Sequence, residues 1–247
     1  MRLPRWYAAA LPAYLAALLA VDTQVGRAGQ VALGLLTCTV LLLALRPLPP
    51  LVRAQTIGVV AFATLGEVTG SLVWGVYHYR LHNLPLFIPP AHGLVYLSGV
   101  SLGRHLRERV VVWAAAAGAA AWGIAGLTLL PRLDVAGAFG VPLLLVFLWR
   151  SRWRSSYAGV FLVVAALELY GTSIGTWRWA TDLPGLGIPD GNPPSGVASG
   201  YVWFDVMALL LAPWLVRTAG AVSRTWGPRS RTAPPAPPAP SAARSGG

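Results

Sequence analysis

Long apolar stretches alternate along the chain with short segments rich in Arg, Pro and Gly. Most of these stretches approach the ~20 residues that an α-helix needs to cross the hydrocarbon of a bilayer. The pattern predicts an all-α fold, a polytopic membrane helix bundle of about eight transmembrane helices. The sixth stretch is short, so seven spans stay an alternative. The predicted spans cover residues 7–22, 29–46, 54–77, 86–103, 110–130, 135–149, 156–176 and 197–216.

Two of the stretches carry the same signature at one constant offset, which indicates an internal repeat. The first copy contains Arg53, Gly58, Glu67 and Gly70. The second copy contains Arg154, Gly159, Glu168 and Gly171. Dividing the chain after Arg107 pairs four spans with four, so residues 1–107 and 108–222 are predicted to be two four-helix repeats. An even number of spans in each half makes the repeats parallel, related by an axis along the membrane normal.

The two ends of the chain differ from this pattern. Residues 223–247 are rich in Pro, Ala, Ser and Arg, with too little apolar content to pack, and predict a disordered cytoplasmic tail. The first stretch also fits a signal peptide. An uncleaved span is favoured because the repeat requires four spans in the first half.

Composition and charge agree with a membrane protein. The chain is 55% hydrophobic and 11% charged, which excludes an ordinary soluble domain. All 19 basic residues are Arg, and they lie between apolar stretches, so a nucleic-acid partner is not expected. One set of span ends holds four of them: Arg27, Arg80, Arg132 and Arg178. The others lie at the opposite ends, which predicts a multi-pass protein of the cell membrane with both termini cytoplasmic.

Glu67 and Glu168 occupy matching places inside apolar spans. An ionisable side chain costs about 2.5 kcal/mol or more at the centre of a membrane helix, so such residues indicate function. On an α-helix, each glutamate shares a face with small or aromatic residues three, four and seven positions later. The first face holds Glu67, Gly70, Ser71 and Trp74, and the second holds Glu168, Gly171, Thr172 and Gly175.

Further polar and aromatic residues lie toward the outer ends of the same spans and in the loops that follow. The candidates for acid–base chemistry are Glu67, Glu168, Asp205 and His92. The candidates for substrate binding are Trp74, Tyr77, Tyr79, Asn83, Tyr96, Trp177, Trp179, Asn192 and Tyr201. Asp205 lies in an Ala- and Leu-rich span and is expected to pair with His92 or an Arg. Asn83, Asn192 and Asp205 are expected to line a water-filled outer funnel.

Several alternatives to a catalytic site stay open. A protonated glutamate can simply hydrogen-bond a neighbouring helix, and aromatic residues at span ends are typical of an interfacial belt. A metal held by Glu67, Glu168, His92 and Asp205 is a further alternative. However, the chain contains four His and no His-Glu-x-x-His motif, so no metal and no cofactor are expected.

Acid chemistry on an isoprenoid accounts best for this combination of residues. Low dielectric favours the protonated form of a carboxyl group, which can then donate its proton at neutral pH. Protonation of an isoprenoid double bond creates a carbocation, and aromatic faces stabilise a cation. Water can trap the cation, or a second alkene of the same molecule can close on it.

Short motifs in both halves resemble one family. Gly66-Glu67-x-x-Gly70, Gly75-x-Tyr77-x-Tyr79 and Pro85-x-x-Ile88-Pro89 are similar to the first half of the integral-membrane carotenoid-biosynthesis proteins, which include carotenoid hydratases. Trp177-x-Trp179 and Gly187-Ile188-Pro189-x-x-Asn192 are similar to the second half. The resemblance covers roughly residues 55–100 and 165–205. It implies that Glu67 is the proton donor and that Tyr77 and Tyr79 line a pocket for a polyene end group.

The sequence thus predicts a membrane-embedded enzyme that acts on a polyisoprenoid or carotenoid-like lipid by hydration or cyclisation at Glu67 and Glu168. The alternative is a proton-coupled transporter or lipid flippase that uses the same glutamates as a proton relay. A third hypothesis is a non-catalytic membrane partner of an enzyme of a lipid pathway. Broken helices near the glutamates would favour transport.

Overall fold

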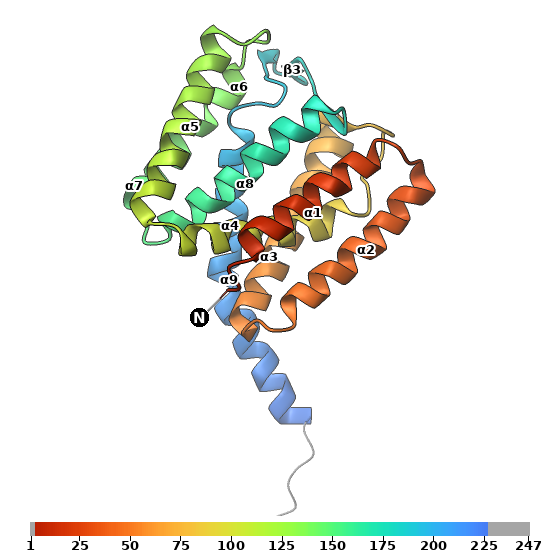
Figure 1. Ribbon diagram of the computed structural model, residues 1–247, viewed down its shortest axis with the longest axis vertical. Helices are drawn as coiled ribbons and strands as arrows, with labels where there is room; N and C mark the ends of the chain where they lie inside the picture. Colours follow the sequence, from red (N-terminus) through yellow and green to blue (C-terminus); the bar gives the residue numbers. More distant parts are fainter. Residues whose placement is uncertain (1–2, 227–247) are drawn as a thin grey trace, which may run out of the picture.

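The chain folds into a bundle of α-helices with a few very short strands (Figure 1). The computed structural model describes residues 3–226. The α-helices are α1 (Tyr7–Asp22), α2 (Arg27–Leu45), α3 (Pro50–Glu67), α4 (Ile88–His105), α5 (Glu108–Thr128), α6 (Val135–Ala138), α7 (Gly140–Arg150), α8 (Arg154–Ser173) and α9 (Val197–Trp226). A π-helix, η1 (Val68–Trp74), continues α3. The strands are β1 (Tyr77–Tyr79), β2 (Trp177–Trp179), β3 (Asp182–Leu183) and β4 (Ile188–Pro189).

Each predicted apolar stretch coincides with helix, the sixth being divided between α6 and α7. Within residues 3–226, five segments are long and apolar enough to cross a membrane: Arg27–Leu45, Pro50–Trp74, Glu108–Thr128, Arg154–Ser173 and Val197–Thr218. The prediction of a helical membrane protein is confirmed at this level, while the arrangement of eight spans in two repeats stays a prediction. α9 runs to Trp226, past the predicted start of the tail, and residues 227–247 lie outside the described part of the chain.

Glycines on α4 and α8 allow these two helices to pack at backbone contact. A Cβ atom on Gly159 of α8 would overlap the carbonyl oxygen of Gly99 of α4. A Cβ atom on Gly103 would likewise overlap the carbonyl oxygen of Ser155. Close approach through small residues is the usual basis of helix association in membranes. α4 and α8 are therefore closely packed, and most of α4 is buried.

α3 packs against α9 as α4 packs against α8. A Cβ atom on Gly58 of α3 would lie 3.2 Å from the Cβ atom of Ala208, and one on Gly66 would lie 2.9 Å from the Phe204 ring. The central helices of each half therefore pack on helices of the other half.

Strands β1 and β2 join the two halves beyond the ends of α3 and α8. They pair antiparallel, with Tyr77 opposite Trp179 and Tyr79 opposite Trp177. Two further backbone hydrogen bonds of 2.9 Å extend the pair, from Arg80 N to the Thr176 oxygen and from Ala180 N to the Val76 oxygen. Each strand follows a glycine with a left-handed backbone, Gly75 at φ 77° and Gly175 at φ 78°. Glycine adopts this conformation without steric cost, so the chain turns sharply out of each helix.

A π-helix follows the first glutamate, where the sequence predicted an α-helix, so the α-helical spacing assumed for Gly70, Ser71 and Trp74 does not hold there. Gly75 is the eighth residue after Glu67, whereas Gly175 is the seventh after Glu168, so the first copy holds one residue more. Hydrogen bonds from residue i to i+5 accommodate an extra residue in a helix, and such π segments frequently occur at functional sites. η1 accommodates the extra residue immediately after Glu67, whereas α8 remains α-helical to Ser173.

Candidate functional site

A glycine three residues after each glutamate leaves room for an aromatic ring to pack against the helix. A Cβ atom on Gly70 would lie 2.9 Å from the Tyr77 ring, and a Cβ atom on Gly171 would overlap the ring of Trp177. The absence of a side chain lets each ring fold back over the helix that precedes it. Tyr77 and Trp177 thereby reach the glutamates of their own copies, from a strand that begins after the helix has ended.

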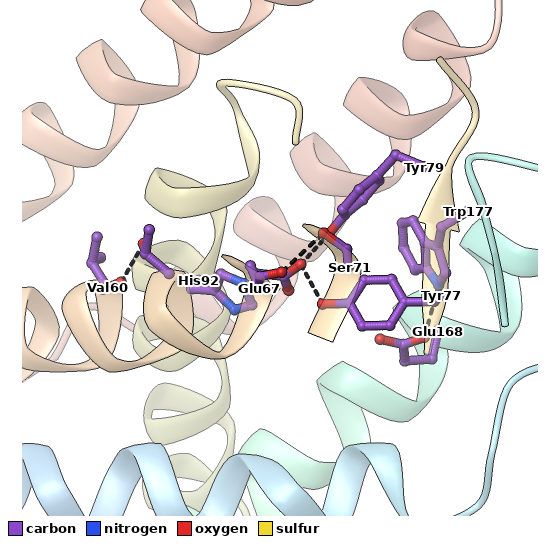
Figure 2. Close-up of polar contacts among 9 residues, drawn as sticks. Val60, Glu67, Ser71, Tyr77, Tyr79, His92, Glu168 and Trp177 are labelled. Carbon is purple, nitrogen blue, oxygen red and sulfur yellow. Dashed lines mark hydrogen bonds and ion pairs between the residues drawn. The ribbon is translucent and has the colours of Figure 1, made fainter. Parts of the chain in front are cut away.

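Glu67 has three polar partners in the interior of the bundle (Figure 2). Its Oε2 accepts hydrogen bonds from the hydroxyl groups of Tyr77 at 2.6 Å and Tyr79 at 2.5 Å. Its Oε1 lies 3.0 Å from Nε2 of His92, which comes from α4. The Glu67 side chain is therefore held from both β1 and α4, and its residue is 8% exposed.

Glu168 has a different set of partners. Its Oε2 accepts a hydrogen bond from the indole Nε1 of Trp177 at 2.9 Å. The Trp179 indole lines the same cavity, and its Nε1 is buried without a hydrogen-bond partner among the described residues. Glu168 lies beside the Tyr77 ring in Figure 2, and the hydroxyl group of this tyrosine donates to Glu67. The two carboxyls therefore belong to one site, with Tyr77 between them.

A cavity of about 590 Å³ contains both carboxyls. Its wall is mainly apolar and aromatic, with contributions from α1, α3, α4, α8, α9 and the strand pair β1–β2. This volume suits a drug-sized ligand, and an apolar pocket with a few convergent polar groups is typical of a ligand site. The polar groups that converge in it are Glu67, Glu168, His92, Tyr77, Tyr79 and Tyr201.

The cavity brings together most of the residues that the sequence singled out. Those on its wall are Glu67, Glu168, His92, Trp74, Tyr77, Tyr79, Trp177, Trp179 and Tyr201. Asn83 and Asn192 lie elsewhere. Asn83 Nδ2 donates to Gln30 Oε1 at 2.9 Å, and Asn192 Oδ1 accepts from the backbone N–H of Trp179 at 2.9 Å. Both amides therefore hold loops in place, where the sequence had predicted contact with substrate.

Asp205 and Tyr96 also lie apart from the glutamates. They line a small separate pocket with Gln55, Arg104 and Tyr157. Each is four residues further along its helix than a residue of the main cavity, Asp205 after Tyr201 and Tyr96 after His92. One helical turn advances about 5.4 Å along the helix axis, which is enough to place Asp205 and Tyr96 beyond the residues that line the main cavity. The predicted pairing of Asp205 with His92 does not occur, because His92 contacts Glu67.

Phe204 and the loop over Trp74 were missed by the sequence interpretation. The Phe204 ring packs against Gly66 and lies 5.4 Å from the Tyr201 ring, on the cavity wall. The indole Nε1 of Trp74 donates to the carbonyl oxygen of Pro184 at 2.9 Å, so the turn between β3 and β4 is fixed to the end of η1. Gly66 belongs to the motif around Glu67, but nothing in the sequence specified which ring packs against it.

The described residues form no metal-binding cluster. Within residues 3–226, no group of three or more His, Cys, Asp and Glu side chains is placed so that it could hold a metal ion.

The loop before α9 is fixed by a buried carboxylate. Asp134 accepts hydrogen bonds from the backbone N–H groups of Gly137 at 3.0 Å, Gly191 at 3.1 Å and Ser195 at 2.7 Å. The neighbouring Asp190 is also buried. Desolvation and the charge of Asp134 raise the pKa of the Asp190 carboxyl to about 7, against opposing effects of Arg132 and the Gly191 N–H.

We expect this loop to make stability depend on pH. The folded protein binds the Asp190 proton more tightly than the unfolded chain does, so this contribution to the free energy of unfolding falls as the pH rises from about 4 to about 7. Asp190→Asn should remove that fall. Unfolding of both proteins in detergent, followed by circular dichroism across this pH range, measures the difference. Parallel pH profiles would contradict the assignment to Asp190.

No protein-family model, curated protein or solved structure matches this chain.

Proposed function

We propose that the chain is a multi-pass protein of the cell membrane with eight spans in two parallel four-helix repeats and both termini in the cytoplasm. The reciprocal packing of α3 on α9 and of α4 on α8 supports this arrangement. The β1–β2 pair supports it too, because its register exchanges the two aromatic residues of each copy. The Arg-rich span ends support the cytoplasmic location of the termini.

We further propose that the protein is an enzyme that acts on a polyisoprenoid or carotenoid-like lipid by acid chemistry at Glu67 and Glu168. The observation that carries this proposal is the placement of both carboxyls in one cavity of about 590 Å³ whose remaining wall is mainly apolar and aromatic. A hydrocarbon substrate fits such a wall, since burial of apolar surface stabilises the complex. A soluble, polar substrate would leave its own polar groups without partners there.

The arrangement supplies the two functions that alkene protonation needs. A carboxyl group in a cavity that excludes bulk water can act as a general acid. The rings of Tyr77, Trp177 and Trp179 surround the carboxyls and present aromatic faces and edges in the same cavity. Such rings stabilise a carbocation electrostatically. Hydration or cyclisation of an isoprenoid end group follows from trapping that cation by water or by a second alkene.

Membership of the integral-membrane carotenoid-biosynthesis proteins is part of this proposal. Its support is the resemblance of the short motifs around Glu67 and Trp177, and both motif regions form the cavity wall. The chemistry proposed for the cavity agrees with that of the carotenoid hydratases in that family.

Lipid and pigment profiling of a deletion strain tests the enzyme proposal. The strain without the gene is expected to accumulate an unsaturated isoprenoid precursor, and complementation with the wild-type gene should convert it to product. The precursor that accumulates identifies the substrate. An unchanged profile in the deletion strain would contradict the enzyme proposal.

One observation favours the alternative of a proton-coupled transporter or lipid flippase. The helix that carries Glu67 changes from α to π immediately after this residue, and irregular helices near intramembrane acids are a feature of transporters. Purified protein in liposomes distinguishes the two functions. Proton flux coupled to lipid movement, and abolished by Glu67→Gln, would establish transport, whereas conversion of an isoprenoid without flux would establish the enzyme.

A further inference from the structure

The two glutamates occupy matching positions in the sequence copies but have different partners. Each has nearby an aromatic ring that packs on a glycine of its own helix, followed two residues later on the same strand by a second aromatic residue. At Glu67 these aromatic residues are tyrosines, and His92 is a third partner. At Glu168 they are tryptophans, of which Trp177 donates to the carboxyl and Trp179 lines the cavity. The position two residues after the Pro-Pro pair is His92 in the first half and Gly196 in the second.

The partners of Glu67 stabilise its ionised form. Both tyrosine hydroxyl groups donate to Oε2, and the imidazole Nε2 lies at hydrogen-bond distance from Oε1. Donors that converge on a carboxylate favour the charged state, and charge-assisted hydrogen bonds are stronger than neutral ones. With Nε2–H donating to Glu67, His92 presents Nδ1 as an acceptor. This atom is buried and has no hydrogen-bond partner among residues 3–226.

The partners of Glu168 leave it neutral. Indole N–H groups donate hydrogen bonds but carry no charge and exchange no proton with a carboxyl. Among the described residues, no Arg or His side chain forms an ion pair with Glu168. An unpaired charge in an apolar environment is costly, and a carboxyl in that situation keeps its proton.

We propose that Glu168 delivers the proton to the substrate and that the Glu67–His92 pair binds and deprotonates the attacking water. This division of roles rests on the proposed function, and it differs from the resemblance, which assigns the proton to Glu67. It also favours hydration over cyclisation, since His92 lines the cavity and its Nδ1 is a buried acceptor without a protein partner among residues 3–226.

The proposed steps conserve atoms and electrons. The Glu168 carboxyl gives its proton to the CH carbon of a terminal isopropylidene double bond. The π electrons of that bond form the new C–H bond and leave a tertiary cation at the dimethyl carbon. A water oxygen forms the C–O bond with that cation, and one of its protons passes to His92 Nδ1. The resulting imidazolium is paired with the Glu67 carboxylate. Proton return from His92 to Glu168 through water closes the cycle, and the net reaction adds water to the alkene.

Infrared spectroscopy tests the protonation states independently of any substrate. Wild-type protein, Glu67→Gln and Glu168→Gln are compared in nanodiscs by difference spectra at neutral pH. Glu168→Gln is expected to lose one protonated-carboxyl C=O band, whereas Glu67→Gln is expected to lose carboxylate bands only. Loss of the protonated-carboxyl band in Glu67→Gln, or its full retention in Glu168→Gln, would overturn the proposal. Monodisperse elution of each variant establishes that it is folded.

Deuterium incorporation tests the chemical roles with lycopene, a linear carotenoid with terminal isopropylidene groups, as the probe. In D₂O, Glu67→Gln and His92→Phe should form no hydrated product, yet they should exchange deuterium into recovered lycopene by reversible protonation. Glu168→Gln should neither hydrate nor exchange. Exchange that survives in Glu168→Gln and is lost in Glu67→Gln would overturn the proposal. With the infrared result as expected, absence of all deuterium in the wild-type reaction would instead contradict the proposed function on carotenoids.

Discussion

Replacement of Glu67 by glutamine is expected to lower product formation by a factor of about 10²–10⁴, the range for a positioned acid–base group. Glutamine keeps the size of the side chain but cannot accept a proton. Its amide also presents N–H groups toward Tyr77, Tyr79 or His92, which donate to the carboxylate in the wild-type protein. Product per amount of membrane-inserted protein, measured in the complemented deletion strain, gives this factor.

Glu108→Gln is the matched control for this substitution. Glu108 lies at the start of α5, is solvent-exposed, and pairs with Arg154 at 2.5 Å. Exposed ion pairs contribute about 0–1 kcal/mol, so this variant should convert the substrate at the wild-type rate. Wild-type turnover in Glu67→Gln would exclude Glu67 from the chemistry.

The second large effect is expected on stability, at the contact between α4 and α8. Gly159→Ala places a methyl group against the carbonyl oxygen of Gly99, which is backbone and has no rotamer to change. The helices must separate, and overpacking of this kind costs about 1–3 kcal/mol, occasionally more. Unfolding by sodium dodecyl sulfate from mild-detergent micelles, followed by circular dichroism, measures the loss.

Gly118→Ala on α5 is the control for the packing argument. A Cβ atom there would have the Phe161 ring at 4.0 Å as its nearest neighbour, so the methyl group has room. Alanine is favoured over glycine in a helix by about 1 kcal/mol, and the free energy of unfolding should rise or stay unchanged. A decrease of equal size in both variants would show that Gly159 has no special packing role.

The positions of the helices could be predicted because each is a long apolar stretch ended by Pro, Gly or Arg. The span predicted at 156–176 is α8 at Arg154–Ser173, and the one at 110–130 is α5 at Glu108–Thr128. The third span was predicted to run to residue 77, but the helical segment ends at Trp74. The extra residue between Glu67 and Gly75 signals this irregularity, and it is visible when the two copies are compared.

Residues of the site could be predicted where an ionisable side chain recurred in both sequence copies. They could not be predicted where the depth of a residue along its helix decides whether it lines the cavity. Glu67 and Glu168 were singled out by their matching places in the two sequence copies, and both line one cavity. Asp205 looked equivalent by polarity alone, yet it lies one turn beyond Tyr201, in the pocket with Tyr96. Hydrophobic periodicity gives the face of a helix but not its depth relative to a neighbouring helix.

The exchange of strands and helices between the halves has a consequence for how such a chain can assemble. A fragment that ends after Arg107 would keep β1 without the strand that pairs with it. It would also expose the faces of α3 and α4 that contact α9 and α8. Neither part can therefore complete its core alone, so residues 1–107 and the rest of the chain have to fold together.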